Sequence, residues 1–579
     1  MPSLSSTIAA LIVFLSLLGL FLSAPSTRPL NCDMECGETL LSLSAAQQFR
    51  EHGIEHGLLE NLGTRENPSI YTHNVNIGAL TFVGLEALGV SDNYKFLLPL
   101  LVYGLGLAYV FLTVRRISGS EQLALVTLVL FATTYWGLGA YALNALRSWH
   151  LLAFFSVIFH TCGIARYPRS GREITGICLG AVAAFGCGYD FWIICAAVAL
   201  FVGLANLETY TLRRIALIAI TLTAAFALPF VVRQIHVAWA MGLSFWAQDF
   251  IYSVAIKVPY AHNFIDIPSL DSIDAYYREH HVLRPPAQPG NTAAQIFFTF
   301  RHMIEFVTVP RWGLITLLTL AGVLITTVIP RIRKTRLASY SAALIVPAVA
   351  GVVVGLIIFA PFSLHVYIKH EFPLLVFLLL LAKGAVIYFL FLIILTKAGV
   401  WKVRVAASLL AIFIFDTAMV HWNNTTYGPA LNLSWGKFFA ARPNDKIALS
   451  VYNLIPTAEP LIGIAQERAV YLSPDTMLSD RSDLQYWIYQ PRERFVDFDS
   501  SVPLCNWTGW LRQLIGWRPP TNPGLSCIYK QPLPKNAVRE RSVAEMIDAS
   551  AKKYSVVEVD QSTHGYVILK LKQYDQSTK

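Results

Sequence analysis

Residues 96–116 read FLLPLLVYGLGLAYVFLTVRR, an apolar run that ends in two arginines. A helix needs roughly 20 apolar residues to cross the ~30 Å hydrocarbon core of a bilayer, and this run has that length. Similar runs recur along the chain, in which 55% of residues are hydrophobic and only 14% are charged. Average soluble proteins carry about 25% charged residues. The composition therefore predicts a multi-pass membrane protein and excludes an ordinary soluble one.

The apolar runs predict about 11 spans, joined by short basic turns and long polar loops. The fold class that follows is mainly α, a polytopic transmembrane helical bundle over residues 1–421. We expect the first run to be a retained helix, because no basic segment precedes it and it is long for a signal peptide. The predicted spans lie near residues 6–24, 96–114, 121–139, 150–165, 174–189, 190–206, 215–232, 312–330, 339–361, 373–396 and 404–421.

Clusters of Arg and Lys mark one side of the predicted membrane. They all fall on the same side if the N-terminus is cytoplasmic, and cytoplasmic loops carry an excess of these residues. The formal net charge of +9 is then a signal of topology, so nucleic acid is not an expected partner. We expect a bacterial inner membrane protein with a cytoplasmic N-terminus. The turns contain Arg115, Arg116, Arg166, Arg169, Arg172, Arg213, Arg214, Arg331, Arg333, Lys334, Arg336, Lys397, Lys402 and Arg404.

The same orientation puts four polar segments outside, at residues 25–95, 233–311, 362–372 and 422–579. The last segment has a different pattern, in which short β-rich runs alternate with helical ones. This alternation predicts a soluble α/β domain in the periplasm. The predicted strands are 446–451, 468–472, 494–498, 527–530, 554–559 and 566–571, and the predicted helices are 456–466, 481–489 and 542–553.

The first external segment holds the strongest candidates for chemistry. It reads NCDMECGE at residues 31–38, so Asp33, Glu35 and Glu38 follow one another closely at the outer end of the first predicted span. Clustered carboxylates can act as a general base toward an acceptor hydroxyl or amine. They can also bind a divalent cation, or begin a solvated helix. The pattern leaves these three roles open.

A series of features around this segment resembles a known superfamily. A helical stretch ends near Gly53, and Tyr-Thr-His at 71–73 precedes an amphipathic stretch that predicts an interfacial helix. A Leu-Gly-Val-Ser turn follows at 88–91, and Arg-Arg-Ile-Ser-Gly at 115–119 closes the next span. With these features, residues 7–165 resemble the GT-C superfamily of membrane glycosyltransferases, in particular relatives of protein mannosyltransferases and aminoarabinose transferases.

The resemblance implies an enzyme that transfers a sugar from a polyprenyl-phosphate carrier to a lipid, glycan or protein on the external face. It also implies a catalytic acid in the first external loop, often within an adjacent Asp-Glu pair. Counted back from Gly53, Glu38 matches the Glu of that pair, whereas Gly37 stands at the Asp position. Asp33 or Glu35 is therefore an alternative base. His73-Asn-Val also departs from the superfamily's usual His-Pro-Pro, which leaves a divergent or inactive member open.

Polar residues at other span ends are candidates for binding the donor. Its leaving group is a lipid phosphate, whose developing charge cations stabilise. Ionisable residues at membrane depth are functional candidates by default, although an interfacial anchor is the alternative. The candidates are His73, Arg147, Asp190, His365, Tyr367, Lys369 and His370.

The leading hypothesis is thus a glycosyltransferase whose partners are a lipid-linked sugar donor, membrane lipids and an unidentified acceptor. The acidic cluster leaves a divalent metal open as its cofactor. A transporter or flippase for a lipid-linked substrate is the first alternative, although it would favour internal repeats. A membrane scaffold that binds a partner through residues 422–579 is the second.

Overall fold

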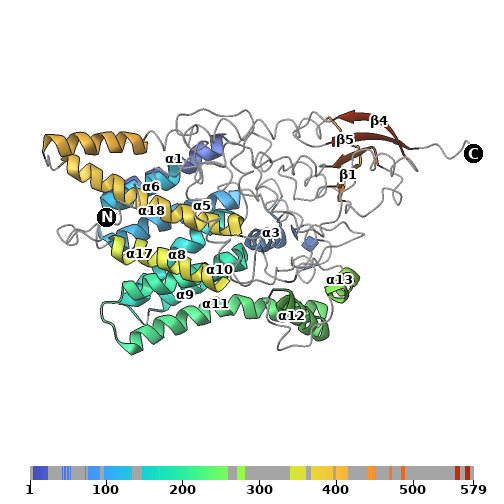
Figure 1. Ribbon diagram of the computed structural model, residues 1–579, viewed down its shortest axis with the longest axis horizontal. Coiled ribbons are helices and arrows are strands. Elements are labelled where there is room, and N and C mark those ends of the chain that lie inside the picture. Colours follow the sequence, from blue (N-terminus) through green and yellow to red (C-terminus); the bar gives the residue numbers. More distant parts are fainter. Residues whose placement is uncertain are drawn as a thin grey trace, which may run out of the picture.

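A helical bundle and a β-sheet beyond one of its ends make up the described part of the computed structural model (Figure 1). The bundle is elongated, and its helices run roughly along the long axis. The structure describes residues 4–23, 42, 45, 46, 49, 50, 53, 72, 76–90, 97–133, 147–168, 170–257, 270–280, 340–359, 367–395, 399–414, 441, 442, 444–450, 469–471, 484–489, 554–560 and 567–573.

Described helices overlap every predicted span except 312–330, which lies outside the described residues, as do residues 134–139 and 415–421 of two other spans. Within the described residues, four stretches are long and apolar enough to cross a membrane: Leu97–Ser118, Ser148–Arg166, Leu212–Met241 and Val376–Leu395. The chain is therefore an integral membrane protein, while the full count of about 11 spans stays a prediction. The bundle contains α1 (Leu4–Ser23), α5 (Leu97–Ser118), α6 (Glu121–Thr133), α8 (Arg147–Arg166), α9 (Gly171–Cys187), α10 (Tyr189–Ala205), α11 (Leu212–Met241), η3 (Ser341–Ile345), α17 (Val346–Phe359), α18 (Tyr367–Leu395) and a helix over 400–414.

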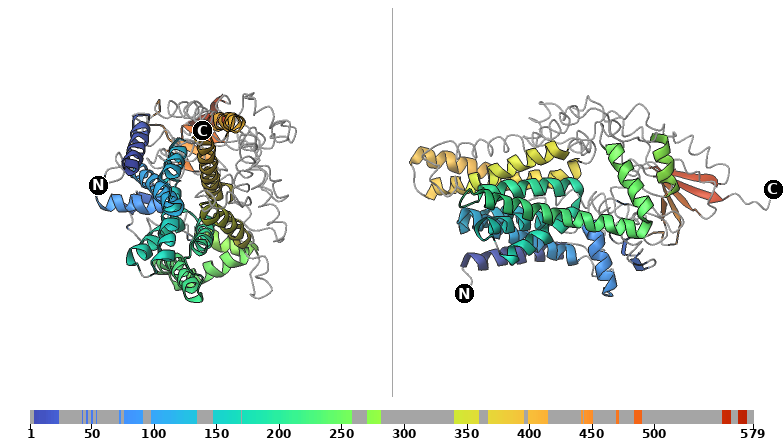
Figure 2. Two further views of the ribbon diagram at one scale, coloured as in Figure 1. Left: turned by 90° about the vertical axis from the view of Figure 1, so that its left-hand side faces the viewer. Right: turned by 90° about the horizontal axis from the view of Figure 1, so that it is seen from below.

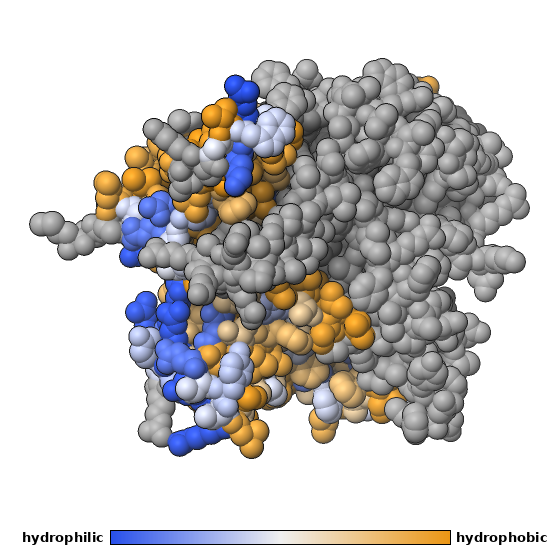
Figure 3. All heavy atoms as spheres, turned by 60° about the vertical axis from the view of Figure 1, so that its left-hand side comes forward, coloured by the Kyte–Doolittle hydropathy of each residue, from blue (hydrophilic) through white to orange (hydrophobic). Residues whose placement is uncertain are grey.

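Several basic turns meet at one end of the bundle, which we call the basic end. Arg115 donates to the Ser6 hydroxyl at 3.2 Å and pairs with Glu121 at 3.0 Å, so α1 begins beside the turn between α5 and α6. Arg166, at the end of α8, donates to the carbonyl of Arg116 at 3.4 Å. Figure 3 shows hydrophilic residues gathered on this end. We call the opposite end the outer end, and its position outside the cytoplasm stays a prediction.

Glycines let α17 approach α10 at backbone distance. A Cβ atom on Gly351 would lie 2.5 Å from the Cα of Val198, and one on Gly355 would lie 2.9 Å from the Cα of Ile194. Small residues allow such packing between membrane helices. The order of these contacts shows that the two helices are antiparallel, so α17 ends at Phe359 near the level at which α10 begins.

Three shorter helices lie toward the outer end: α3 (Ile77–Ala87), α12 (Leu243–Lys257) and α13 (Leu270–Glu279). The Asn76 side chain caps α3 by accepting hydrogen bonds from the backbone N–H groups of Gly78 at 2.8 Å and Ala79 at 3.3 Å. Figure 2 shows α3, in blue, running across the direction of the bundle helices. This orientation agrees with the interfacial helix predicted after residue 73, because a helix on a membrane surface lies across the spans.

Five strands of the described part form a mixed sheet in the order β2-β1-β3-β5-β4. β1 is parallel to β2 and β3, whereas β5 is antiparallel to β3 and β4. The strands are β1 (Ile447–Ser450), β2 (Ala469–Tyr471), β3 (Tyr486–Tyr489), β4 (Tyr554–Asp560) and β5 (Val567–Gln573). Four of them confirm the predicted strands at 446–451, 468–472, 554–559 and 566–571.

The predicted helix over 481–489 is wrong at residues 486–489, where β3 forms between β1 and β5. The sequence Tyr-Trp-Ile-Tyr favours a strand, because aromatic and β-branched residues pack well on a pleated sheet. The predicted strands 494–498 and 527–530 and the predicted helices 456–466 and 542–553 lie outside the described residues. A complete α/β domain over 422–579 thus stays a prediction.

Candidate functional site

The structure describes some of the predicted site residues completely, others only in their backbone, and the rest not at all. The side chain of Asp190 is described, in the first turn of α10. The backbones of Arg147, Tyr367, Lys369 and His370 are described, in the first turns of α8 and α18, but their side chains are outside the description. Asp33, Glu35, Glu38, His73 and His365 lie wholly outside the described residues.

At the outer end, the ends of several helices lie next to one another. The ring of His150 on α8 lies 4.5 Å from the ring of Phe191 on α10, edge to face. A Cβ atom on Gly186 would lie 2.6 Å from the Cβ of Ile77, so α3 begins against the last turn of α9. α17 ends at Phe359, level with the start of α10, at this same end. The backbones of Arg147 and Asp190 therefore share the outer end with the last residue of α17.

Asp190 is buried, with an exposed fraction of 2%. It lies in the first turn of α10, where the partial positive charge of the helix N-terminus favours a carboxylate. Gly188, with φ 137°, makes the turn from α9 into α10 in a single residue. Only glycine adopts such a conformation without strain. The sharp turn thus carries Asp190 directly into the packed part of the bundle.

Arg233 is a buried residue that we did not select from the sequence, and its exposed fraction is 3%. Its Nη1 lies 2.8 Å from Nδ1 of His236. A guanidinium only donates, so Nδ1 of His236 accepts this hydrogen bond. Trp192, one turn into α10, stacks on Phe230 of the antiparallel α11 with the ring centroids 6.2 Å apart, which puts Arg233 about level with the start of α10. The sequence signal that could have identified this pair is an Arg and a His three residues apart at the end of an apolar run.

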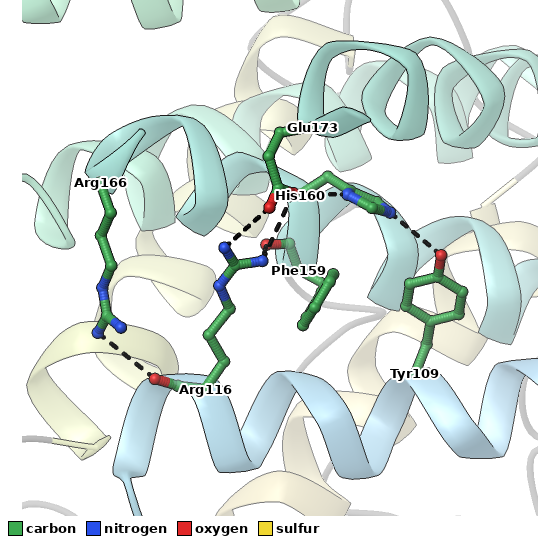
Figure 4. A network of polar contacts seen from close by, with 6 residues as sticks. All are labelled: Tyr109, Arg116, Phe159, His160, Arg166 and Glu173. Carbon is green, nitrogen blue, oxygen red and sulfur yellow. Dashed lines mark hydrogen bonds and ion pairs between the residues drawn. The ribbon is translucent and has the colours of Figure 1, made fainter. Parts of the chain in front are cut away.

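A second buried cluster lies at the basic end and connects α5, α8 and α9. Arg116 pairs with Glu173 at 3.0 Å, and the other oxygen of Glu173 lies 2.7 Å from Nδ1 of His160. Nε2 of His160 lies 3.1 Å from the Tyr109 hydroxyl. Figure 4 shows these four side chains pointing toward one another. We call Tyr109, Arg116, His160 and Glu173 the basic-end network.

Neighbouring residues pack closely around the charged groups of this network. Arg116 also donates to the carbonyl of Phe159 at 3.0 Å, and its guanidinium lies 4.4 Å from the centre of that ring. A Cβ atom on Gly163 would lie 2.2 Å from the carboxyl carbon of Glu173. One on Gly176 would lie 2.3 Å from the ring of His160. Because the ionic groups bond to one another and fill the available space, the network is suited to holding helices together rather than to binding a substrate.

A metal ligand set is not found in the part of the chain that the structure describes. Among those residues, no group of three or more His, Cys, Asp or Glu side chains is placed to hold a metal ion. The predicted ligands Asp33, Glu35 and Glu38 lie outside that part. Metal binding by the first loop therefore stays a proposal.

Comparison with solved structures finds matches of low sequence identity. The chain is similar to the oligosaccharyltransferase of Archaeoglobus fulgidus in complex with Zn and sulfate, with 11% identity and a TM-score of 0.47 over 86% of this chain and 70% of that one. It is also similar to ArnT from Cupriavidus metallidurans bound to undecaprenyl phosphate, with 13% identity and a TM-score of 0.37 over 86% of this chain and 95% of that one.

The chain matches no protein-family model and no curated protein.

Proposed function

We propose that this protein is a membrane glycosyltransferase that moves a sugar from a polyprenyl-phosphate carrier to a lipid, glycan or protein acceptor at the outer end of the bundle. The observation that carries the proposal is the gathering of ionisable residues at this end. Asp190 and Arg233 are buried there, and α8 and α18 begin there with Arg147 and with the segment that contains Lys369. A buried ionisable residue near a membrane surface is costly and is commonly retained for function.

The proposed reaction needs a base and a cationic site. One carboxylate among Asp33, Glu35 and Glu38 would take the proton of the acceptor as the acceptor oxygen or nitrogen attacks the anomeric carbon. The bond from that carbon to the phosphate oxygen breaks through an oxocarbenium-like transition state. The lipid phosphate leaves with both electrons of the bond, and cations such as Lys369 and Arg147 would stabilise its charge.

The first-loop acids are also the proposed metal ligands. Carboxylate oxygens are the donors that hard divalent cations prefer, so this set fits such an ion. A bound cation would supply positive charge next to the departing phosphate. Loss of transfer in EDTA and its recovery with Mn²⁺ or Mg²⁺ would support a metal requirement, while full activity in EDTA would contradict it.

We also propose the sidedness of the enzyme. The outer end would face the periplasm of a bacterial inner membrane, with the N-terminus in the cytoplasm and residues 422–579 outside. The basic end supports this orientation, because cytoplasmic turns are enriched in Arg and Lys. Protease protection of tags at the two termini in right-side-out vesicles tests it, and protection of the C-terminal tag would reverse the assignment.

The decisive experiment measures transfer by the full chain in proteoliposomes. Polyprenyl-phosphate donors with radiolabelled sugars are supplied together with lipid, glycan and peptide acceptors. We expect at least one of Asp33→Asn, Glu35→Gln and Glu38→Gln to lower kcat by about 10²–10⁴-fold, the usual range for general base catalysis. Glu121→Gln, at the basic end, is the matched control. Undiminished transfer by the triple variant would overturn the assignment of the base.

The fate of the donor separates the alternative functions. A transferase releases free polyprenyl phosphate, which mass spectrometry detects in the lipid fraction. A flippase would move the donor between leaflets and leave it intact. A scaffold would lose its partner on deletion of residues 422–579 without any change in donor consumption.

A further inference from the structure

Helices α12 and α13 form a two-layer unit beyond the end of α11. Phe245 and Tyr252 of α12 are buried against Ile273 and Tyr277 of α13, and Val237 of α11 joins the same cluster. The side chains of this cluster are apolar or aromatic. The two helices therefore pack as one body attached to the outer end of the longest helix in the described part.

The acidic residue Asp249 lies inside this two-helix unit. Asp249 of α12 is buried, and the Tyr277 hydroxyl donates to its Oδ1 at 3.0 Å. Burial raises the pKa of Tyr276 to about 12 and raises that of Tyr277 further, with Asp249 adding to both shifts, so the two phenols stay protonated. Among the α12 side chains that the structure describes, Asp249 is thus the charged one, and it does not reach the outer face.

The outer face of α12 is mainly apolar, with Ser244 as its exposed polar residue, and nothing in the described part covers it. Leu243, Phe250 and Ile251 are 70%, 44% and 40% exposed. The outer face of α13 differs, since its exposed residues include Glu279 and Ala275. Removing apolar surface from water lowers the free energy by about 25 cal/mol per Å². An apolar environment would therefore stabilise the α12 face more than the α13 face.

This apolar face continues the surface by which α11 meets the membrane. Val232, Ile235 and Trp239 are exposed along α11, which is one of the four stretches able to cross a bilayer. The turn at Gly242, with φ 89°, then redirects the chain into α12. In Figures 1 and 2, α12 runs across the bundle direction, and α13 lies farther from the bundle than α12 does. The face of α12 opposite α13 is thus the one turned toward the membrane.

We propose that the outer face of α12 lies in the membrane surface at the outer end, at the boundary between headgroups and acyl chains, with α13 on its water side. Interfacial helices bind membranes through such an apolar face. Trp239, at the junction with α11, has the position of a residue in the aromatic belt of a membrane protein. The continuity with the lipid-facing side of α11 selects the lipid surface over a protein partner. This inference does not depend on the reaction that the protein performs.

The test uses the full chain in vesicles of phosphatidylcholine and phosphatidylglycerol, with its native cysteines replaced by serine. Phe250→Cys and Ile251→Cys are labelled with the environment-sensitive fluorophore NBD, and Ala275→Cys on α13 is the matched control. We expect the labels at 250 and 251 to be quenched at least twofold more by doxyl-labelled lipid than the label at 275. Iodide in the buffer should quench the label at 275 and spare the other two.

Quenching of the labels at 250 and 251 by iodide to the same extent as the label at 275 would overturn the proposal. Protection of these labels from both iodide and doxyl-lipid would also overturn it, because another part of this chain, a second copy or a different protein would then cover the face. If the cysteine-free chain fails to insert, a phosphatidylcholine with a diazirine in its acyl chain is cross-linked to the unaltered protein. Adducts on residues 243–251 then support the proposal, and adducts confined to the bundle helices contradict it.

Discussion

At the basic end of the bundle, Arg116, Glu173 and His160 bond to one another across three helices. At the outer end, Asp190 and Arg233 are buried on α10 and α11. The residue types are alike, but the first set links three helices at the basic end, whereas the second lies at the end where we propose the reaction. A closed ionic set contributes to the stability and specificity of packing. We therefore expect substitutions at the basic end to change stability and substitutions at the outer end to change transfer.

The largest expected effect comes from breaking the closed set. Arg116→Ala would leave the Glu173 carboxylate buried without its main partner, and the loss of one member of a buried pair costs about 3–5 kcal/mol. We expect this loss in the free energy of unfolding, measured by denaturant titration in bicelles. Transfer per folded molecule should stay within about twofold of the parent, a factor that corresponds to less than 0.5 kcal/mol.

Arg213→Ala supplies the control, because Arg213 is exposed at the start of α11. It should change the free energy of unfolding by less than about 0.5 kcal/mol, as surface substitutions usually do. If Arg116→Ala matched this control in stability and instead abolished transfer, the assignment of stability to the basic end and of activity to the outer end would be wrong. The basic-end network would then belong to the functional machinery.

Two glycines of α9 provide the next test. Gly176→Ala would put a methyl group 2.3 Å from the His160 ring, so the imidazole has to shift away from Glu173. Such overpacking typically costs about 1–3 kcal/mol. Gly171→Ala is the matched control on the same helix, because its Cβ would meet nothing within 4 Å. Equal melting temperatures for the two variants would show that the network tolerates movement of His160.

The outer end should respond in activity rather than in stability. Asp190→Asn keeps the shape of the side chain and removes its charge, so we expect about a tenfold loss of kcat/KM for the lipid-linked donor, equivalent to ~1.4 kcal/mol. Glu208→Gln, an exposed acid at the other end of α10, should leave transfer unchanged. Unchanged transfer by Asp190→Asn would remove this residue from the substrate-binding set.

The spans could be predicted from the sequence because bilayer thickness imposes a length on each apolar run. The span predicted at 96–114 illustrates this well, since α5 begins at Leu97 and ends just beyond its two arginines. The strand at Tyr486–Tyr489 could not be predicted, because its state is decided by pairing with β1 and β5, which lie far away in the sequence. Local patterns carry little information about such partners.

The basic-end network shows a different limit. Arg116 and Arg166 report topology by their positions alone, and that part of the prediction needs no tertiary contact. The pairing of Arg116 with Glu173 joins residues 57 positions apart, and no periodicity reveals it. Asp190 could be selected because an acid inside an apolar run is rare. Arg233 was harder to select, because it follows its run and has the position of an ordinary interfacial anchor.

The smallest expected effect concerns the attachment of the first loop to the outer end. Arg50 binds Glu86 of α3 through two bonds of 2.6 and 2.9 Å, and Ala45 and Phe49 pack against Val83 beside it. Since Arg50 is about half exposed, the pair should contribute only ~0.5–1 kcal/mol. We expect Arg50→Glu and Glu86→Arg each to lower kcat about twofold to threefold, with KM for the donor unchanged, because the first-loop acids precede this attachment.

The double reversal should restore most of the activity, since the pair can form again with its charges exchanged. The coupling between the two substitutions should weaken in about 0.5 M salt, as it does for exposed ion pairs. If the double variant is no better than the worse single variant, the ion pair does not position the loop. The apolar contacts of Phe49 with Val83 would then be sufficient to hold the first loop at the outer end. The expected difference in activity between the two ends would then depend on Asp190 and Arg233 alone.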